Sequence, residues 1–445
     1  MNTETPLLIF VPKLTPRVRY IFKFIFQDVL KISFQFCLNE NQFTEAKQPK
    51  FSYSNHALGD ELFFAARSLL FETGLKDQDL HPFEFKGIKV FYATNKTSAL
   101  PFDPFAAAFF LVSRYEEYLP AIRDQHDRFE ATESLAYQQN FLGKPVVDIW
   151  AMEIKSVLLE KFPQLEFGEK NYTYLSTIDI DNAYAIKEKG FVRASAGLAQ
   201  SILKGNLAET WMRIKVLLRL EKDPYDTYDL QLSIQKKYNL KPLYFFLFAE
   251  YGKFDKNVPV YNQIFHHLIK SISDTAAVGI HPSYASNKDK LKLETEIKRL
   301  SKVINRDITF SRQHFLKLRL PETYKNLLDF DISEDYTMGY AGKIGFRAGT
   351  CTPFFFYDLD LELETKLKVH PFQVMDATLC NYMKIQPDEC LKYVKPIIDE
   401  IKAVNGTFVT LWHNESLSNN WPWKGWRNVY EEIVLEALPK SDVNS

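Results

Sequence analysis

The chain has 445 residues, about three times the length of an average domain, so two domains with sizeable cores are expected. Its 55 basic and 56 acidic side chains give a formal charge of -1, which excludes a nucleic-acid binder that works through a general excess of positive charge. With 46% hydrophobic and 25% charged residues, the composition also excludes a mostly disordered or fibrous chain.

The cysteines and the N-terminal segment indicate the compartment. Glu4 precedes a short apolar run at 7–11 that ends at Pro12, which predicts a strand and not a signal peptide. No apolar run approaches the roughly 18 residues of a membrane helix. The sequence predicts a cytoplasmic protein without a membrane span and leaves its oligomeric state open. A disulfide framework or thiolate zinc site is not expected, because the cysteines are few and irregularly spaced: Cys37, Cys351, Cys380 and Cys390.

Residues 1–168 are predicted to form an N-terminal α/β domain of unknown role that contributes no catalytic group. Strands are expected at 51–54 and 88–92. A helix is expected to begin at Pro104 with Asp103 as its N-cap. The polar end of this helix should face solvent or the second domain, and it carries Arg114, Glu116 and Glu117.

Residues 169–445 show repeated strand-then-helix units, with a helical insertion at about 192–238. The alternation predicts a parallel α/β architecture and favours a (β/α) barrel of about seven strands over an open sheet. A glycine fingerprint for a dinucleotide or phosphate loop is not found. The expected strands lie at 172–179, 243–248, 276–280, 308–311, 344–346, 372–374 and 407–411.

Polar side chains gather where these strands end. Each has a simple structural explanation: an Asp can cap a helix, a His can be a hydrogen-bonded core residue, and an Arg can form a buried ion pair. Loops that follow parallel strands converge on one face, however, so together these side chains predict a reactive site there. They are Asp179, Asp181, His281, Arg312, His314, Arg347, Asp376 and His413.

From about residue 172 to 416 the chain resembles the polysaccharide deacetylase, or NodB-homology, family of carbohydrate esterases. The resemblance is to a two-domain subgroup with an uncharacterised N-terminal domain. It begins at Thr-Ile-Asp-Ile-Asp, residues 177–181, which is similar to the family's Thr-Phe-Asp-Asp motif. The resemblance implies a distorted parallel barrel, with Asp179 as general base and Asp181 as a metal ligand.

The second family motif, His-Ser/Thr-x-x-His, matches only in part. His281 stands at the first histidine, but Ala285 replaces the second. We expect His314 as the substitute ligand, although Arg312 can equally be the functional side chain at that strand end, and Ser283 can act through water. The donor set suits zinc, with cobalt, nickel or manganese as alternatives.

Two further motifs complete the resemblance. The segment 347–350 is similar to Arg-x-Pro-Tyr without its Pro and Tyr, which implies that Arg347 orients the base. The Leu-Trp-His segment at 411–413 implies His413 as the general acid, with Asp376 orienting it.

The expected function is a metal-dependent hydrolase that removes N-acetyl, or secondarily O-acetyl, groups from a carbohydrate. Trp421 and Trp423 can stack on a sugar or close the barrel as a hydrophobic plug, and Tyr284 is a further candidate for substrate contact. A glycoside hydrolase using two of Asp179, Asp181 and Asp376 is one alternative, and metal dependence discriminates against it. A non-catalytic carbohydrate-binding relative is the other.

Overall fold

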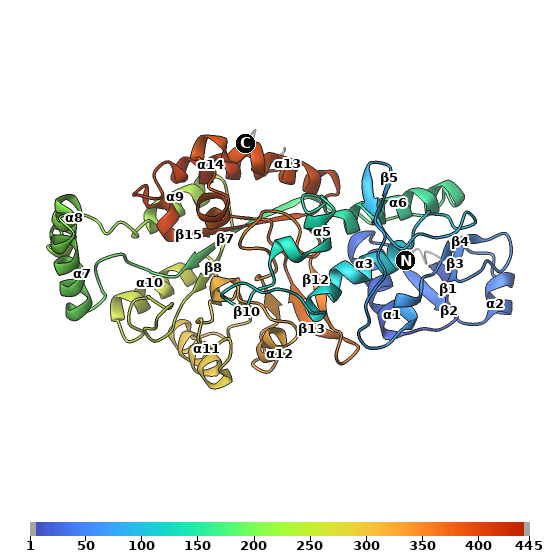
Figure 1. Cartoon of the computed structure of the whole chain (residues 1–445), viewed down its shortest axis with the longest axis horizontal. Helices are drawn as coiled ribbons and strands as arrows, with labels where there is room; N and C mark the ends of the chain where they lie inside the picture. The colour runs from blue at the N-terminus through green and yellow to red at the C-terminus, as the bar shows by residue number, and fades with distance from the viewer. Residues whose placement is uncertain (1–5, 440–445) are drawn as a thin grey trace.

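The computed structural model describes residues 6–439. Figure 1 shows an elongated molecule with the N-terminal strands at one end and two helices, α7 (Phe191–Leu203) and α8 (Leu207–Leu217), at the other. A large sheet lies between them. None of the helices in the described residues is both long and apolar enough to cross a lipid bilayer.

The N-terminal part contains a four-stranded parallel sheet in the order β2-β1-β3-β4. The helix expected at Pro104 is α3 (Pro104–Val112), and the Asp103 carboxylate caps it as predicted by accepting from two amides of its first turn. All nine residues of α3 are buried. The other elements are β1 (Leu7–Phe10), α1 (Pro16–Lys23), β2 (Phe34–Cys37), α2 (Glu40–Glu45), β3 (Lys50–Ser54), β4 (Leu62–Ala65), β5 (Phe83–Phe85), β6 (Ile88–Val90), α4 (Tyr115–Tyr118), α5 (Leu135–Gln138) and α6 (Val146–Lys161).

The second sheet has nine strands in the order β12-β13-β11-β10-β9-β8-β7-β15-β14. Neighbouring strands are parallel except for the antiparallel pair β12–β13. The architecture is therefore α/β with mainly parallel strands, as predicted. The strands are β7 (Thr173–Ile180), β8 (Leu243–Phe246), β9 (Ala277–Ile280), β10 (Phe310–Ser311), β11 (Glu334–Asp335), β12 (Phe354–Asp358), β13 (Leu363–Val369), β14 (Val374–Met375) and β15 (Thr407–His413).

Helices separate most of these strands, and three of them, α7, α8 and α9, fill the stretch between β7 and β8. The strand expected at 344–346 is wrong. Its amides bond to two different segments, Gly345 to the Gln373 carbonyl and Phe346 to the Leu142 carbonyl, so no ladder forms. The remaining helices are α9 (Tyr228–Lys237), α10 (Gln263–Ser273), α11 (Lys290–Ile304), α12 (Glu322–Leu328), α13 (Cys390–Ala403) and α14 (Trp426–Ala437).

The chain from β13 to β14 links the two ends of the large sheet. Its β13 part pairs with β11, and β14, which begins five residues after β13 ends, pairs with β15. Between them, the Phe372 amide donates to the Met338 carbonyl and the Gln373 amide to the Val409 carbonyl. The carboxyl ends of β7, β9, β10 and β15 consequently point toward one region.

The N-terminal part packs directly on the large sheet. A single cluster of buried apolar side chains extends from Leu7 in β1 to Val369 in β13. Tyr20 of α1 and Phe109 of α3 both contact Tyr357 of β12, with ring centroids 4.9 and 5.2 Å apart. This shared core holds the N-terminal part in a defined position beside the site described next.

Candidate functional site

A pocket with about 720 Å³ of empty space, open to solvent, lies at the carboxyl ends of the parallel strands. It contains most of the polar side chains that the sequence placed at strand ends. The predicted site residues that line it are Asp179, Asp181, His281, His314, His413 and Trp423.

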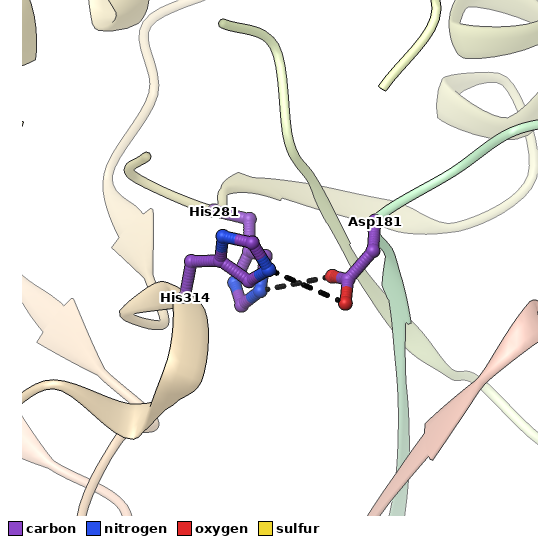
Figure 2. A group of neighbouring side chains, drawn as sticks. All are labelled: Asp181, His281 and His314. Atoms are coloured by element: carbon purple, nitrogen blue, oxygen red, sulfur yellow. Dashed lines mark ion pairs between the residues drawn. The ribbon is translucent and has the colours of Figure 1, made fainter. Parts of the chain in front are cut away.

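Asp181, His281 and His314 form a compact donor cluster. Asp181 Oδ1 lies 3.1 Å from His281 Nε2, and Asp181 Oδ2 lies 3.4 Å from His314 Nε2. One ligand atom from each residue lies within 4.8 Å of the others. Figure 2 shows both imidazoles pointing at the carboxylate. Donors about 2.0 to 2.2 Å from a common zinc ion lie at comparable separations, so small side-chain movements bring the cluster to coordination distance.

Second contacts orient both imidazoles. His281 Nδ1 lies 2.6 Å from the backbone carbonyl of Arg312, and His314 Nδ1 lies 2.9 Å from Asp255 Oδ1. A carbonyl oxygen can only accept, so His281 Nδ1 carries the proton and Nε2 of the neutral ring has a free lone pair. Metal-binding histidines are typically held in this way by a carbonyl or a carboxylate. The sequence contained no signal for Asp255, which lies in the loop after β8.

The charges in the cluster reinforce one another. Burial alone raises the pKa of Asp181, but the surrounding imidazoles, chiefly His314, hold it well below its usual range. Burial lowers the pKa of His314, but the carboxylates of Asp181 and Asp255 raise it to about 9. Asp181 Oδ1 is buried and, among the described residues, no group meets it in hydrogen-bond geometry. An ionised carboxylate with an unsatisfied oxygen beside two oriented imidazoles suits a divalent cation.

The partner of Asp179 differs from the expected one. Arg312, and not Arg347, contacts the Asp179 carboxylate, with Nη1 2.9 Å from Oδ1. Arg312 also donates to Thr177 Oγ1 and to the Tyr336 carbonyl, at 2.6 and 2.9 Å. The sequence left open whether Arg312 or His314 is the functional side chain at this strand end, and in the structure each of them contacts an aspartate of the site.

Arg347 contacts Glu117 and not Asp179, the expected base. Its Nε and Nη2 atoms lie 2.8 and 2.6 Å from the two carboxylate oxygens of Glu117, which comes from the N-terminal part. A buried bidentate carboxylate is the preferred partner of a guanidinium, and it leaves Arg347 turned away from Asp179. Arg114 donates to the same carboxylate at 2.8 Å, so this helix end faces the second part of the protein and not solvent.

His413 has the partner that was expected. Its Nδ1 lies 2.8 Å from Asp376 Oδ1, and its amide donates to Asp376 Oδ2 at 2.8 Å. Burial lowers the pKa of His413, but the charge of Asp376 and the contact with it raise the pKa well above its usual value. His413 Nε2 lies 3.9 Å from Asp181 Oδ2, which is farther from the Asp181 carboxylate than His281 and His314 are. The His413 imidazole therefore lies beside the donor cluster.

The expected substrate contacts agree with the pocket only in part. Trp423 lines it, whereas Trp421 is 91% exposed and does not. Tyr284 is not a lining residue either, because its ring packs against Phe254 and Phe315, with centroids 4.3 and 5.4 Å away.

The pocket also contains residues that the sequence did not indicate. Arg128, from the N-terminal part, donates to the Phe315 carbonyl at 2.9 Å and to the Tyr382 hydroxyl at 3.3 Å. The sequence predicts that the N-terminal part contributes no catalytic group. Arg128 gives it a side chain in the pocket wall, although the hydrogen bonds of Arg128 go to residues other than Asp179 and His413. Further unforeseen lining residues are Gln313, Asn381, Tyr382 and Glu415.

Comparisons with known proteins reveal distant similarities. A model described as a family of unknown function (DUF7033) matches residues 7–163. Comparison with curated proteins gives no match. The chain is similar to a solved structure from Mycobacterium smegmatis named as a polysaccharide deacetylase, with 12% identity, a TM-score of 0.40 and coverage of 62% of this chain and 88% of that one.

Two other solved structures are similar to the chain at comparably low sequence identity. A CE4 family pseudoenzyme from Bacillus anthracis has 11% identity and a TM-score of 0.29, over 59% of this chain and 60% of that chain. An allantoinase has 10% identity and a TM-score of 0.39, over 61% of this chain and 88% of that chain.

Proposed function

We propose that this protein is a metal-dependent hydrolase that removes N-acetyl groups, or secondarily O-acetyl groups, from a carbohydrate. The observation that carries the proposal is the convergence of Asp181, His281 and His314 in one pocket, between the Asp179 carboxylate and the His413 imidazole. We further propose that the parallel strands of this nine-stranded sheet form a distorted (β/α) barrel, closed where the chain runs from β13 to β14.

Asp181, His281 and His314 would hold the metal, with zinc as the first candidate and cobalt, nickel or manganese as alternatives. A bound divalent ion polarises a carbonyl and lowers the pKa of water. The chain's own contribution is the orientation of the donors: the Arg312 carbonyl and the Asp255 carboxylate direct the two Nε2 atoms toward Asp181.

Asp179 would act as the general base and His413 as the general acid. Asp179 is held by Arg312, whose guanidinium is itself fixed by two further acceptors. Asp376 raises the pKa of His413, which keeps a proton on the imidazole for a departing amine. The two groups lie on neighbouring strands, where His413 pairs directly with Asp179 in the β15–β7 register.

The carbohydrate part of the proposal rests on the four partial motifs of the sequence. Trp423 borders the pocket, but it is only 5% exposed and packs against Trp426 with ring centroids 5.7 Å apart, which supports its alternative role as a hydrophobic plug.

The geometry favours this function over a glycoside hydrolase built on an Asp pair. In such an enzyme one carboxyl group must keep its proton, which requires a raised pKa. Imidazoles hold the pKa of Asp181 well below its usual range instead. Asp376 is committed to His413 through both oxygens, so it is not free for the role either.

Metal analysis combined with acetate release tests the proposal. The purified protein should bind about one zinc or cobalt ion per chain and release acetate from N-acetylated oligosaccharides when the metal is present. His314→Gln should lose both properties. His370→Gln is the matched control, because His370 also contacts a carboxylate, that of Glu334 at 2.8 Å, but does not line the pocket.

Each outcome has a distinct meaning. Metal content that His314→Gln and Asp181→Asn leave unchanged would contradict the metal site. Stoichiometric metal without acetate release from any N- or O-acetylated sugar would contradict the enzyme and favour a non-catalytic carbohydrate-binding protein.

A further inference from the structure

The helical hairpin formed by α7 and α8 exposes an unusual amount of apolar surface. Within residues 191–217, all of which the structure describes, only Ser201 and Val216 are buried. The described residues contain 24 exposed large hydrophobic side chains, and nine of them lie in the short stretch 191–220. Monomeric soluble proteins rarely concentrate apolar surface in this way unless it contacts something. The nine are Phe191, Val192, Ile202, Leu203, Leu207, Trp211, Leu217, Leu218 and Leu220.

The exposed residues of α8 follow a helical pattern. Leu207, Trp211 and the C-cap residue Leu218 are spaced by four and seven residues, which places them on one side of the helix. They are 80%, 60% and 64% exposed. In an ordinary surface helix such a stripe faces the core, whereas here its side chains are exposed, and α8 lies at one end of the molecule (Figure 1).

The hairpin is also strongly basic. Residues 191–220 contain one acidic side chain, Glu209, in a protein whose formal charge is -1. Glu209 pairs with Arg213 at 2.8 Å. Lys215 Nζ lies 6.0 Å from the centre of the Trp211 ring, beside the apolar stripe, and pairs with Glu221, just beyond the stretch, at 3.7 Å. The five basic residues of the stretch are Arg193, Lys204, Arg213, Lys215 and Arg219.

The basic charge and the apolar side chains of the hairpin together favour one kind of binding partner. A second copy of the chain would bring two basic hairpins together, and like charges oppose that contact. An amphipathic helix with Trp and Leu on one face and Lys and Arg beside them is typical of a segment that lies in the interface of an anionic bilayer.

We propose that the α7–α8 hairpin binds the surface of a membrane that contains anionic lipids. The apolar side chains of the hairpin enter the boundary between headgroups and acyl chains, and its exposed basic side chains Lys204 and Arg219 contact lipid phosphates. Arg193 holds the start of α7 to the rest of the protein by donating to the carbonyls of Lys256 and Asn257, at 2.7 and 2.8 Å. Because α7 begins ten residues after Asp181, the start of the hairpin lies within about 35 Å of Asp181.

Co-sedimentation of the full chain with vesicles tests this proposal. Vesicles of phosphatidylcholine mixed with phosphatidylglycerol should bind the protein, pure phosphatidylcholine vesicles should bind it much less, and added salt should weaken binding. Leu207→Glu should reduce affinity for the anionic vesicles by about tenfold or more, because it removes a buried apolar side chain and adds repulsion.

Leu291→Glu is the matched control. Leu291 is 75% exposed and lies, like Leu207, in the first turn of a helix, α11, so both substitutions change the charge equally and both helices tolerate an acid there. Leu291→Glu should leave vesicle binding unchanged. Equal losses in the two variants, or no preference for anionic vesicles, would contradict the proposal. A dimer in sedimentation velocity that Leu207→Glu dissociates, without vesicle binding, would make the hairpin a contact between copies and would also overturn it.

Discussion

Arg312 reaches Asp179 across two intervening strands. Arg312 follows β10 and Asp179 lies in β7, yet Nη1 and Oδ1 are 2.9 Å apart and both side chains are at most 2% exposed. The guanidinium passes over the ring of Phe245 in β8, with its centre 4.6 Å from the ring centroid. A buried charge pair of this kind holds the carboxylate in one position, which a general base requires.

Arg312 is therefore a positioning residue for the proposed base. Arg312→Lys keeps the charge but loses the planar fork that contacts Thr177 and Tyr336. We expect kcat to fall by about 10²-fold while metal content and KM change little, since the loss affects alignment of the base. Steady-state kinetics with metal analysis measure this. Arg319→Lys, at a guanidinium that is 51% exposed, should leave kcat unchanged.

Asp179→Asn should separate proton transfer from metal binding. The substitution preserves shape but removes the basic group, so turnover should fall by about 10² to 10⁴-fold with metal content retained. Acetate release and metal analysis on the same preparation measure both. Activity equal to that of the unmodified protein would assign the base to another residue.

Asp376→Asn should change the pH dependence of the reaction. The acid must be protonated, so activity should fall as pH rises through the pKa of His413. Asp376 raises that pKa, and its removal lowers it, which moves the basic limb of the pH–rate profile to lower pH. A profile of kcat/KM against pH measures the shift. An unchanged basic limb would mean that His413 is not the acid.

Asp255→Asn should weaken metal binding without removing a ligand. The Asp255 carboxylate orients His314 through Nδ1, at 2.9 Å. Loss of such a partner typically costs about 10- to 100-fold in metal affinity. Competition with a zinc-binding dye measures the change. Asp226→Asn, at a carboxylate that pairs with Lys187 away from the pocket, should leave the affinity unchanged.

Glu117→Gln should destabilise the contact between the two parts of the chain. Arg114 and Arg347 are both buried against Glu117, so the substitution leaves the buried Arg347 without its carboxylate and Arg114 with Glu116 alone, and it should cost about 3 to 5 kcal/mol. Denaturant unfolding measures the difference. Glu400→Gln, in the exposed pair with Lys144, should cost at most about 1 kcal/mol.

The same carboxylate should make stability fall in acid. Burial raises the pKa of Glu117, but the charges of Arg347 and Arg114 lower it from 4.5 to about 2 in the folded protein. Because the folded-state pKa is the lower one, this stabilisation is present above about pH 4.5 and is lost as pH falls toward 2. Unfolding free energies measured over this range should decline less steeply in Glu117→Gln than in the unmodified chain.

The sequence by itself determined several of the elements and the polar residues at their ends, although it did not indicate β11, β12 or β13. Alternating apolar residues before Asp179 and Asp181 predict β7, and the position of Asp103 before Pro104 predicts the cap of α3, because both patterns depend on neighbours in the chain. The strand-end rule brought His281 and His314 to the same edge as Asp181, since the carboxyl ends of parallel strands share one edge.

Only the tertiary structure decided which arginine contacts Asp179. Arg312 and Arg347 both follow segments that look like strands, and nothing local distinguishes them. The stretch at 344–346 forms no ladder, and Glu117, 230 residues earlier in the chain, takes Arg347. Glu117 reaches Arg347 because the N-terminal part packs on the large sheet. The same packing places Arg128 in the pocket wall. Contacts between such distant segments depend on how two buried surfaces fit together, and local sequence patterns contain no information about that fit.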